Sequence, residues 1–263
     1  MEERYHPNST CERDRTPMRR DGGKGCAMVL HDQPALSDFK EVRGMADATA
    51  IDFYFDPSCR WAWWTSVWLR RVAKLRPVTV TWKLFSLAVQ DSPEDYRQVV
   101  RPDHAQHIRN FDLLRVLALA RRRGGNAAIE RLFAAYGNAI HGAKEDIWDT
   151  QVQARCLEIA GQPASLYAAA LADPATEADV LAESRAALAL GALGTPTLAL
   201  SGASTSLFGP ILGQVPSGDD ALRLWDNVRF TLETPYCYEL KRNRGATPSG
   251  QFNDDEDLAI SVV

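Results

Sequence analysis

The 263-residue sequence predicts an α/β protein with the order strand, helix, strand, long helical section, two short strands and final helix. Runs rich in β-branched and aromatic residues, which are typical of strands, occur near both ends of the ordered region. Apolar residues at helical spacing fill the section between them. The 45% share of hydrophobic residues is sufficient for a full core.

The first predicted unit contains two strands joined by a helix. A β-prone run over 48–55 ends at Asp56-Pro57-Ser58, which predicts a strand entering a tight turn. The following segment predicts an amphipathic helix of about four turns. Its apolar stripe contains Trp61, Trp64, Trp68 and Val72. A second strand is predicted over 78–87, after Pro77.

The section over 93–190 predicts several helices. Helical spacing is interrupted at Gly124-Gly125 and again at residues 161–163 and 173–174. After Gly191 the pattern predicts short strands at 197–200 and 206–208 and a helix over 218–232.

These patterns predict a discontinuous sheet domain over 48–92 and 191–245, with a helical subdomain over 93–190 inserted between its second and third strands. Residues 1–47 lack apolar periodicity, which is typical of a disordered arm. Residues 246–263 are predicted to be a flexible tail.

Composition argues against several classes of function. The net charge of -4 provides no general attraction to nucleic acid or anionic membranes, so neither is expected as a partner. No secretory signal or membrane-spanning run is evident, which predicts a cytoplasmic protein. The five cysteines are too scattered for a disulfide framework, and no metal or flavin motif is present. We therefore expect free thiols.

Cys59 is the candidate reactive thiol because it stands where the first helix begins. Unsatisfied N–H groups and the helix dipole favour a thiolate at this position, and Arg60 is expected to act in the same direction. The alternative interpretation is a small buried cysteine without chemistry. A second feature, Gly194-Thr195-Pro196-Thr197, suits a cis-proline turn that exposes the Thr195 backbone, although an ordinary proline at a strand entry has the same sequence.

Several ordered segments resemble DsbA-like thioredoxin-fold proteins of the mycothiol-dependent nitroreductase type. The resemblance covers about residues 48–252 and rests on Phe55-Asp56-Pro57-Ser58-Cys59-Arg60-Trp61-Ala62-Trp63, Gly194-Thr195-Pro196-Thr197, Phe208-Gly209-Pro210, Leu224-Trp225-Asp226 and Glu239-Leu240-Lys241-Arg242. It implies a thioredoxin-like fold with a helical insertion over the active site, and a motif cysteine that faces a cis-proline loop. It also implies reduction by a low-molecular-weight thiol, mycothiol or glutathione, and a homodimer as a possible assembly.

The motif departs from the family's dithiol form, Cys-Pro-Trp-Cys. Arg60 replaces the proline and Ala62 replaces the second cysteine, so the usual intramolecular dithiol cycle is absent. We expect a thiol-dependent oxidoreductase or transferase that acts on a small molecule through Cys59 alone. The alternatives are thiol addition and elimination, as in a glutathione transferase or isomerase, and a redox-inactive binding protein. Cys156 is interpreted as a core residue.

His141 ends a segment that resembles the family's cleft-facing helix, and it is the candidate proton donor because its ordinary pKa lies near neutrality. A helix-end histidine that interacts with the dipole is the alternative. His104 and His107 are interpreted as exposed polar residues, and Trp64 and Trp68 as core residues. Trp61 and Trp63 are expected to wall an apolar pocket. The full predicted thiol and substrate site consists of Pro57, Ser58, Arg60, Trp61, Trp63, Asn138, Thr195 and Pro196.

Overall fold

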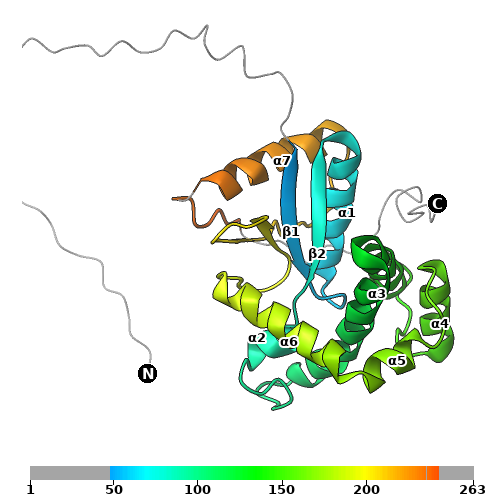
Figure 1. Ribbon diagram of the computed structural model, residues 1–263. Helices are drawn as coiled ribbons and strands as arrows, with labels where there is room; N and C mark the ends of the chain where they lie inside the picture. Colours follow the sequence, from blue (N-terminus) through cyan, green and yellow to red (C-terminus); the bar gives the residue numbers. More distant parts are fainter. Residues whose placement is uncertain (1–47, 235, 243–263) are drawn as a thin grey trace, which may run out of the picture. The chain divides into compact units, whose positions relative to one another are not determined.

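A computed structural model describes residues 48–234 and 236–242 of the chain (Figure 1). The predicted arm over 1–47 and tail over 246–263 lie outside the described residues. So do Cys11, Cys26 and the last three residues of the predicted sheet domain.

A four-stranded sheet with the order β2-β1-β3-β4 forms the framework (Figure 1). Strand β1 (Thr49–Phe55) pairs in parallel with β2 (Val78–Leu84) and antiparallel with β3 (Thr197–Leu200), which pairs antiparallel with β4 (Leu207–Phe208). Phe53 lies opposite Trp82 on one side and Leu198 on the other. The strands predicted at 48–55, 197–200 and 206–208 are confirmed.

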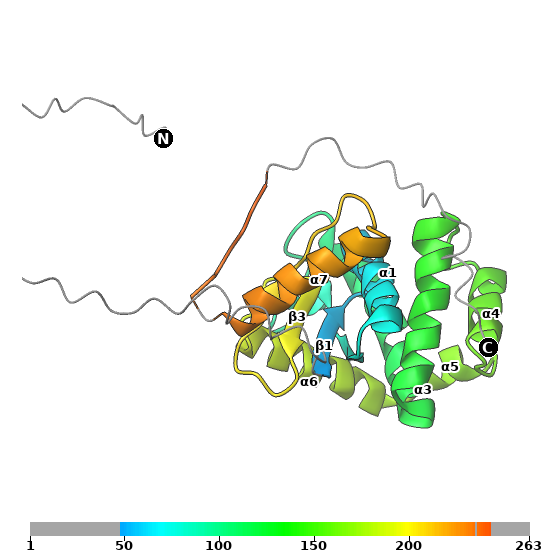
Figure 2. The same ribbon diagram turned by 90° about the horizontal axis from the view of Figure 1, so that it is seen from above.

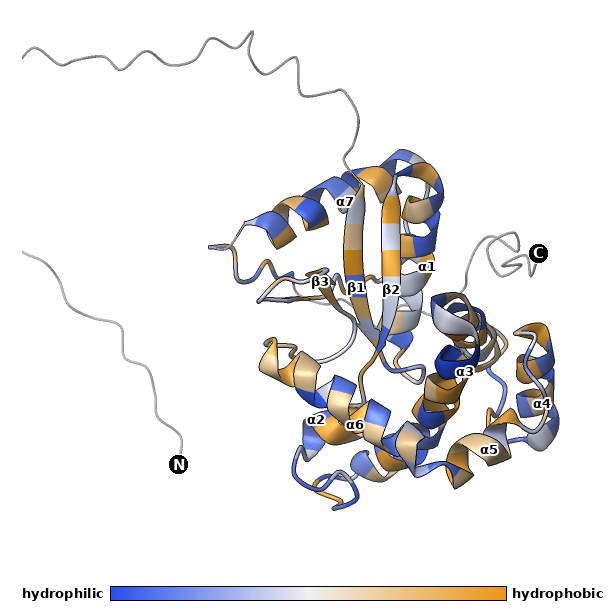
Figure 3. Cartoon of the chain, viewed as in Figure 1, coloured by the Kyte–Doolittle hydropathy of each residue, from blue (hydrophilic) through white to orange (hydrophobic). Residues whose placement is uncertain are grey.

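Alternate residues of β1 face opposite sides of the sheet, as a pleated strand requires. Ile51, Phe53 and Phe55 belong to the main hydrophobic core, whereas Tyr54 packs with Ala187 of α6 (Pro174–Ala189). Hydrophobic residues recur along β1 and β2 (Figure 3). The sheet therefore has a buried surface on both faces.

Helix α1 (Arg60–Leu75) connects β1 with β2, and α7 (Gly218–Glu233) lies alongside it (Figure 2). Trp68 Nε1 donates a hydrogen bond of 3.0 Å to Ala221 O, and the Trp68 and Trp225 ring centroids lie 6.3 Å apart. Trp64 and Trp68 are buried, which confirms their assignment to the core. This packing fixes the direction of α1.

Between β2 and β3 the chain forms α2 (Leu87–Asp91), α3 (His104–Gly137), a π-helical turn η2 (Asn138–Gly142), α4 (Thr150–Ile159), α5 (Leu166–Ala172) and α6. The predicted interruption at Gly124-Gly125 is a kink in α3, and Gly125 has φ 67°. The predicted second strand is too long at its carboxyl end. It stops at Leu84 because Ser86 caps α2, with Ser86 Oγ accepting from Val89 N.

Helix α3 contributes aromatic residues to the same core as the sheet. Phe133 stacks on Phe55 at a centroid distance of 3.8 Å and contacts Trp82 edge-on at 5.7 Å. The buried guanidinium of Arg70 lies 4.3 Å from the Trp82 centroid and 3.4 Å from Glu130 Oε1. Burial lowers the pKa of Arg70 to about 10, so this side chain stays charged at neutral pH. The helical section and the sheet thus share one core.

A glycine allows α3 to approach α1 closely. A Cβ atom at Gly137 would lie 2.0 Å from Trp63 Cε3, with two further indole carbons within 2.5 Å. Both residues are buried. Only a residue without a side chain fits at this crossing.

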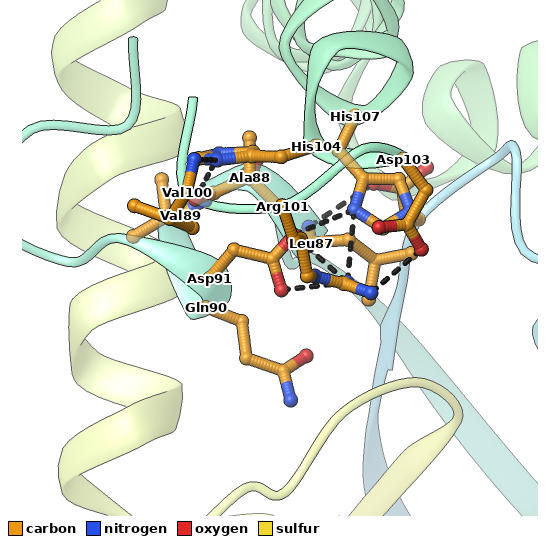
Figure 4. Close-up of polar contacts among 12 residues, drawn as sticks. Leu87, Ala88, Val89, Gln90, Asp91, Val100, Arg101, Asp103, His104 and His107 are labelled. Atoms are coloured by element: carbon orange, nitrogen blue, oxygen red, sulfur yellow. Dashed lines mark hydrogen bonds and ion pairs between the residues drawn. The ribbon is translucent and has the colours of Figure 1, made fainter. Parts of the chain in front are cut away.

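Polar contacts attach α2 to the start of α3 (Figure 4). Arg101 donates to both Asp91 carboxylate oxygens at 2.7 and 2.9 Å, and His107 Nδ1 lies 2.8 Å from Asp91 Oδ2. His104 Nδ1 accepts from Val100 N, and its ring is fully buried. The interpretation of both histidines as exposed is wrong, because the loop before α3 folds over them.

Gly137→Ala is expected to destabilise the protein by about 1–3 kcal/mol, because the added methyl group overpacks the core. Gly to Ala inside a helix ordinarily stabilises by about 0.5–1 kcal/mol, so the sign of the change is itself informative. Denaturant unfolding measures it. The double variant Gly137→Ala/Trp63→Leu should lose less stability than the sum of the losses in the two single variants. An increase in stability for Gly137→Ala would contradict this packing.

Candidate active site around Cys59

The turn between β1 and α1 is organised by Asp56, which sequence reasoning treated only as a turn residue. Asp56 Oδ1 accepts hydrogen bonds from Ser58 N at 2.9 Å and Ser58 Oγ at 2.6 Å, and Oδ2 accepts from Leu87 N at 3.3 Å. Burial raises the pKa of the Asp56 carboxyl, and these hydrogen bonds act against the rise. The Asp-Pro-Ser pattern is the sequence signal for this side-chain turn. Its burial beside a cysteine is visible only in the structure.

Cys59 is the residue immediately before α1, with an extended backbone (φ -80°, ψ 111°). The residue as a whole is partly exposed, and its sulfur lies 3.4 Å from the carbonyl oxygen of Thr195, to which the thiol donates. The Thr195–Pro196 peptide bond is cis. The structure therefore brings the two sequence features together across 136 positions of the chain.

The expected lowering of the Cys59 pKa is wrong for this arrangement. Burial is the largest effect and raises the pKa, and the carboxylate of Asp56 raises it further. The Thr195 side chain and the backbone N–H groups of Ala62 and Trp61 lower it, but the net direction is upward. The N–H groups at the helix start lower the Cys59 pKa, as predicted, but desolvation raises it by more. The resting sulfur is a thiol that donates its hydrogen to a carbonyl.

The loop that faces the sulfur is held by contacts on both sides of Thr195. Thr197 Oγ1 donates to Gly194 O at 2.7 Å, and Gln90 Nε2 donates to Leu193 O at 2.8 Å. The Thr195 hydroxyl is buried and has no hydrogen-bond partner among the described residues. A thiolate at Cys59 would supply an acceptor to this hydroxyl.

His141 binds the turn before Cys59 and does not titrate near neutrality. Its Nε2 lies 2.9 Å from Pro57 O, and burial lowers the pKa of the ring to about 4, with smaller contributions from Lys144 and Arg60. The ring is therefore neutral at pH 7, with its proton on Nε2, and donates to the carbonyl. The expectation that His141 exchanges a proton near neutral pH is wrong because its ring is buried. His141 is a positioning residue.

The two tryptophans of the motif have different environments. Trp61 is partly exposed and contacts Trp64 edge-on at 5.8 Å. Trp63 is fully buried against Phe133, so its expected place in a pocket wall is wrong: this position of α1 faces the core. The remaining predicted site residues lie on the turn before α1 or at the end of α3. Pro57 is buried, Ser58 and Asn138 are partly exposed, and Arg60 is exposed.

The other described cysteines are free thiols with no contact to Cys59. Cys156 is buried, as expected, and its thiol donates to Ala135 O at 3.6 Å. Burial raises the pKa of Cys156 to about 11. Cys237 is partly exposed near the end of the described residues.

Comparison with known proteins identifies the family and the fold. Residues 58–242 match the family model described as Rv2466c-like, mycothiol-dependent nitroreductase Rv2466c. The chain belongs to this family. The nitroreductase family assignment confirms the resemblance found in the sequence and makes the chain a thiol-dependent oxidoreductase in broad class. A relative in Mycobacterium tuberculosis, the uncharacterized protein Rv2286c, is 37% identical over 197 residues, which cover 74% of this chain and 82% of that protein.

Solved structures agree with the fold of this nitroreductase family member. A probable DsbA oxidoreductase from Streptomyces coelicolor has a TM-score of 0.50 at 21% identity, covering 77% of this chain and 97% of that one. A 2-hydroxychromene-2-carboxylate isomerase also has a TM-score of 0.50, at 17% identity, covering 70% of this chain and 95% of the other. The predicted DsbA-like thioredoxin fold is confirmed.

Residues 48–234 and 236–242 contain neither a metal-binding cluster nor a membrane-spanning helix. In these ranges no group of three or more His, Cys, Asp or Glu side chains could hold a metal ion. No helix in the same ranges is both long and apolar enough to cross a membrane.

His141 gives the stability of the protein a specific pH dependence. The unfolded state takes up a proton near pH 6.5 and the folded state only near pH 4. Unfolding is therefore favoured progressively as the pH falls through this window, by up to about 3 kcal/mol, and not above it. His141→Gln keeps a donor for Pro57 O but does not titrate. The difference in free energy of unfolding between the wild type and His141→Gln should shrink by this amount as the pH falls from 6.5 to about 4. A difference that does not change with pH would contradict the lowered pKa of His141.

Thr195→Val is expected to slow alkylation of Cys59 at pH 7 by about fivefold, because the thiolate loses one hydrogen-bond donor. Thr195→Ser retains the hydroxyl and should react at nearly the wild-type rate. The rates are read from the Cys59 peptide by mass spectrometry over a pH series. Equal rates for Thr195→Val and wild type would show that the hydroxyl does not act on the sulfur.

Proposed function

We propose that this chain is a cytoplasmic thiol-dependent oxidoreductase that acts on a small molecule through Cys59 alone, with mycothiol or glutathione as the reducing thiol. The observation that carries the proposal is a partly exposed Cys59 whose sulfur lies 3.4 Å from Thr195 O, at the start of a helix whose third residue is a buried Ala62. A second thiol is absent at the position where a resolving cysteine would be needed. Release of an adduct therefore falls to an external thiol.

The proposed cycle has two exchange steps. In the first, Cys59 loses its proton to solvent and its thiolate attacks one sulfur of a mixed or symmetric disulfide, forming an enzyme disulfide and expelling the other sulfur as a thiolate. In the second, an external thiolate attacks the adduct sulfur and releases Cys59. Electrons balance because each step breaks one S–S bond and forms another.

Net reduction of an organic acceptor needs two external thiols in each cycle. For a nitro compound, two thiols become one disulfide while the nitro group becomes nitroso and one oxygen leaves as water. For a quinone, the same two electrons and two protons give the hydroquinone. Both acceptors are flat, and the partly exposed face of Trp61 suits such a molecule.

The Thr195 hydroxyl has no hydrogen-bond partner among the described residues, which supports a role for this loop in binding the thiol. The hydroxyl is buried, and the Thr195 side chain lowers the pKa of Cys59. We infer that Thr195 and Pro196 receive the thiol, and that Trp61 and Asn138 border the remaining space. Ser58 and Pro57 act indirectly, because Asp56 and His141 hold the turn on which they lie.

The direct test is mass spectrometry of the full chain after incubation with the disulfide of mycothiol, or with glutathione disulfide. We expect one thiol adduct on Cys59, removed by excess free thiol, and no adduct at that position in Cys59→Ser. The peptides that contain the other four cysteines serve as internal references. Adducts on those cysteines with Cys59 unmodified would refute the proposed mechanism.

Two outcomes would redirect the assignment. Turnover of a substrate without net consumption of thiol would identify an addition and elimination reaction instead of reduction. Full biological activity of Cys59→Ser would identify a binding protein that does not use the thiol.

A further inference from the structure

The first residue of α1 introduces a positive charge where a helix least favours one. The N-terminus of a helix carries a partial positive charge, so acidic residues are stabilising in the first turn and basic residues are not. Here the first turn contains no acidic residue and begins with the exposed Arg60. This unfavourable placement lies next to the reactive sulfur.

Lys144 brings a second cation to the same site. It has a left-handed backbone (φ 59°), and its Nζ donates to His141 O at 2.6 Å. The positive charges of Lys144 and Arg60 both lower the pKa of His141, whose ring contacts Pro57 two residues before Cys59. Lys144 is bonded to the His141 carbonyl and Arg60 directly follows Cys59, so the two cations belong to the two segments that meet at the contact between His141 and Pro57.

Neither cation is neutralised by a carboxylate within the described part of the chain. Among residues 48–234 and 236–242 no ion pair involves Arg60 or Lys144, and the neighbouring Glu145 is paired with Arg155. Asp56 is fully buried, and its oxygens accept from Ser58 and Leu87. The positive charge beside the thiol is available to a ligand.

Other groups at the site suggest the rest of that ligand. The buried Thr195 hydroxyl has no partner among the described residues. Leu193, two positions before it, is 72% exposed. Phe208 is 39% exposed, and a Cβ atom added at the intervening Gly194 would lie 3.2 Å from its ring carbon Cε2. Trp61 is also partly exposed. These apolar surfaces favour a molecule with an apolar body, and the cations favour a negative end.

We propose that Arg60 and Lys144 form an anion subsite, so that the site takes a small molecule bearing a carboxylate next to the atom that Cys59 attacks. The proposal rests on the proposed function. The carboxylate belongs either to the second substrate or to the reducing thiol. Glutathione carries carboxylates and mycothiol does not, so the two steps of the cycle separate these sources.

The test for the first step compares an anionic aromatic disulfide, dithiobis-nitrobenzoate, with a neutral one, dipyridyl disulfide. Both disulfides react with the same Cys59 thiolate. A change in the pKa or nucleophilicity of that thiolate therefore cancels in the ratio of the two rates. Cys59→Ser supplies the rate at the other cysteines. Arg60→Gln and Lys144→Gln should each lower the anionic-to-neutral ratio about threefold, and together about tenfold. Added salt should lower the wild-type ratio in the same direction.

Lys74→Gln is the matched control, because it removes an exposed cation from the last turn of the same helix. Its ratio should equal that of the wild type. Unchanged ratios in Arg60→Gln and Lys144→Gln, or an equal fall in Lys74→Gln, would overturn the subsite while Cys59 reactivity upheld the proposed function. Absence of reaction at Cys59 with both probes would overturn both proposals.

The source of the carboxylate is decided in the second step. N-acetylcysteine and its neutral methyl ester release the Cys59 adduct at rates whose ratio is compared in the same variants. If the variants lower the anionic-to-neutral rate ratio only in the disulfide step, the carboxylate belongs to the second substrate. A fall in the release step assigns it to the thiol, and a fall in neither step refutes the subsite.

Discussion

The close contact between Gly137 and the Trp63 indole is the constraint on which the site depends. It allows the end of α3 to lie directly against the start of α1, where a Cβ atom would meet ring carbons at 2.0 Å. The π-helical turn that follows then carries His141 to Pro57 O. A neutral, buried imidazole fixes the turn before Cys59, so packing between two helices determines where the sulfur lies.

The sulfur is held between opposing influences. Backbone N–H groups at the helix start and the Thr195 side chain favour a thiolate, whereas burial and Asp56 favour the thiol, and the thiol prevails. Hydrogen bonding to Thr195 O also suits the protonated state. A molecule that displaces this contact and brings positive or hydrogen-bonding groups would change the balance. We therefore propose that ligand binding raises the reactivity of Cys59.

The departures from the family's dithiol motif are consistent with one another. Ala62 is buried and leaves Cys59 as the only thiol of the motif, while Arg60 adds an exposed charge beside it. Lys144 adds a second cation on the segment whose His141 contacts Pro57. Under the two proposals made above, outside molecules both resolve the adduct on Cys59 and neutralise the cations. Both needs point to small-molecule chemistry.

The sequence alone determined the order of elements and the cysteine at a helix start. It offered the cis-proline loop as one of two interpretations, and the resemblance of its motifs indicated the family. Local rules suffice for these features, because helical spacing, turn residues and motif order are read along the chain. Only the tertiary structure decided that Trp63 is core, that His141 is neutral and that desolvation raises the Cys59 pKa. Each depends on burial by residues far away in the chain, which periodicity cannot reveal. The sequence identifies the candidate residues of the site, and contacts between residues far apart in the chain determine their chemistry.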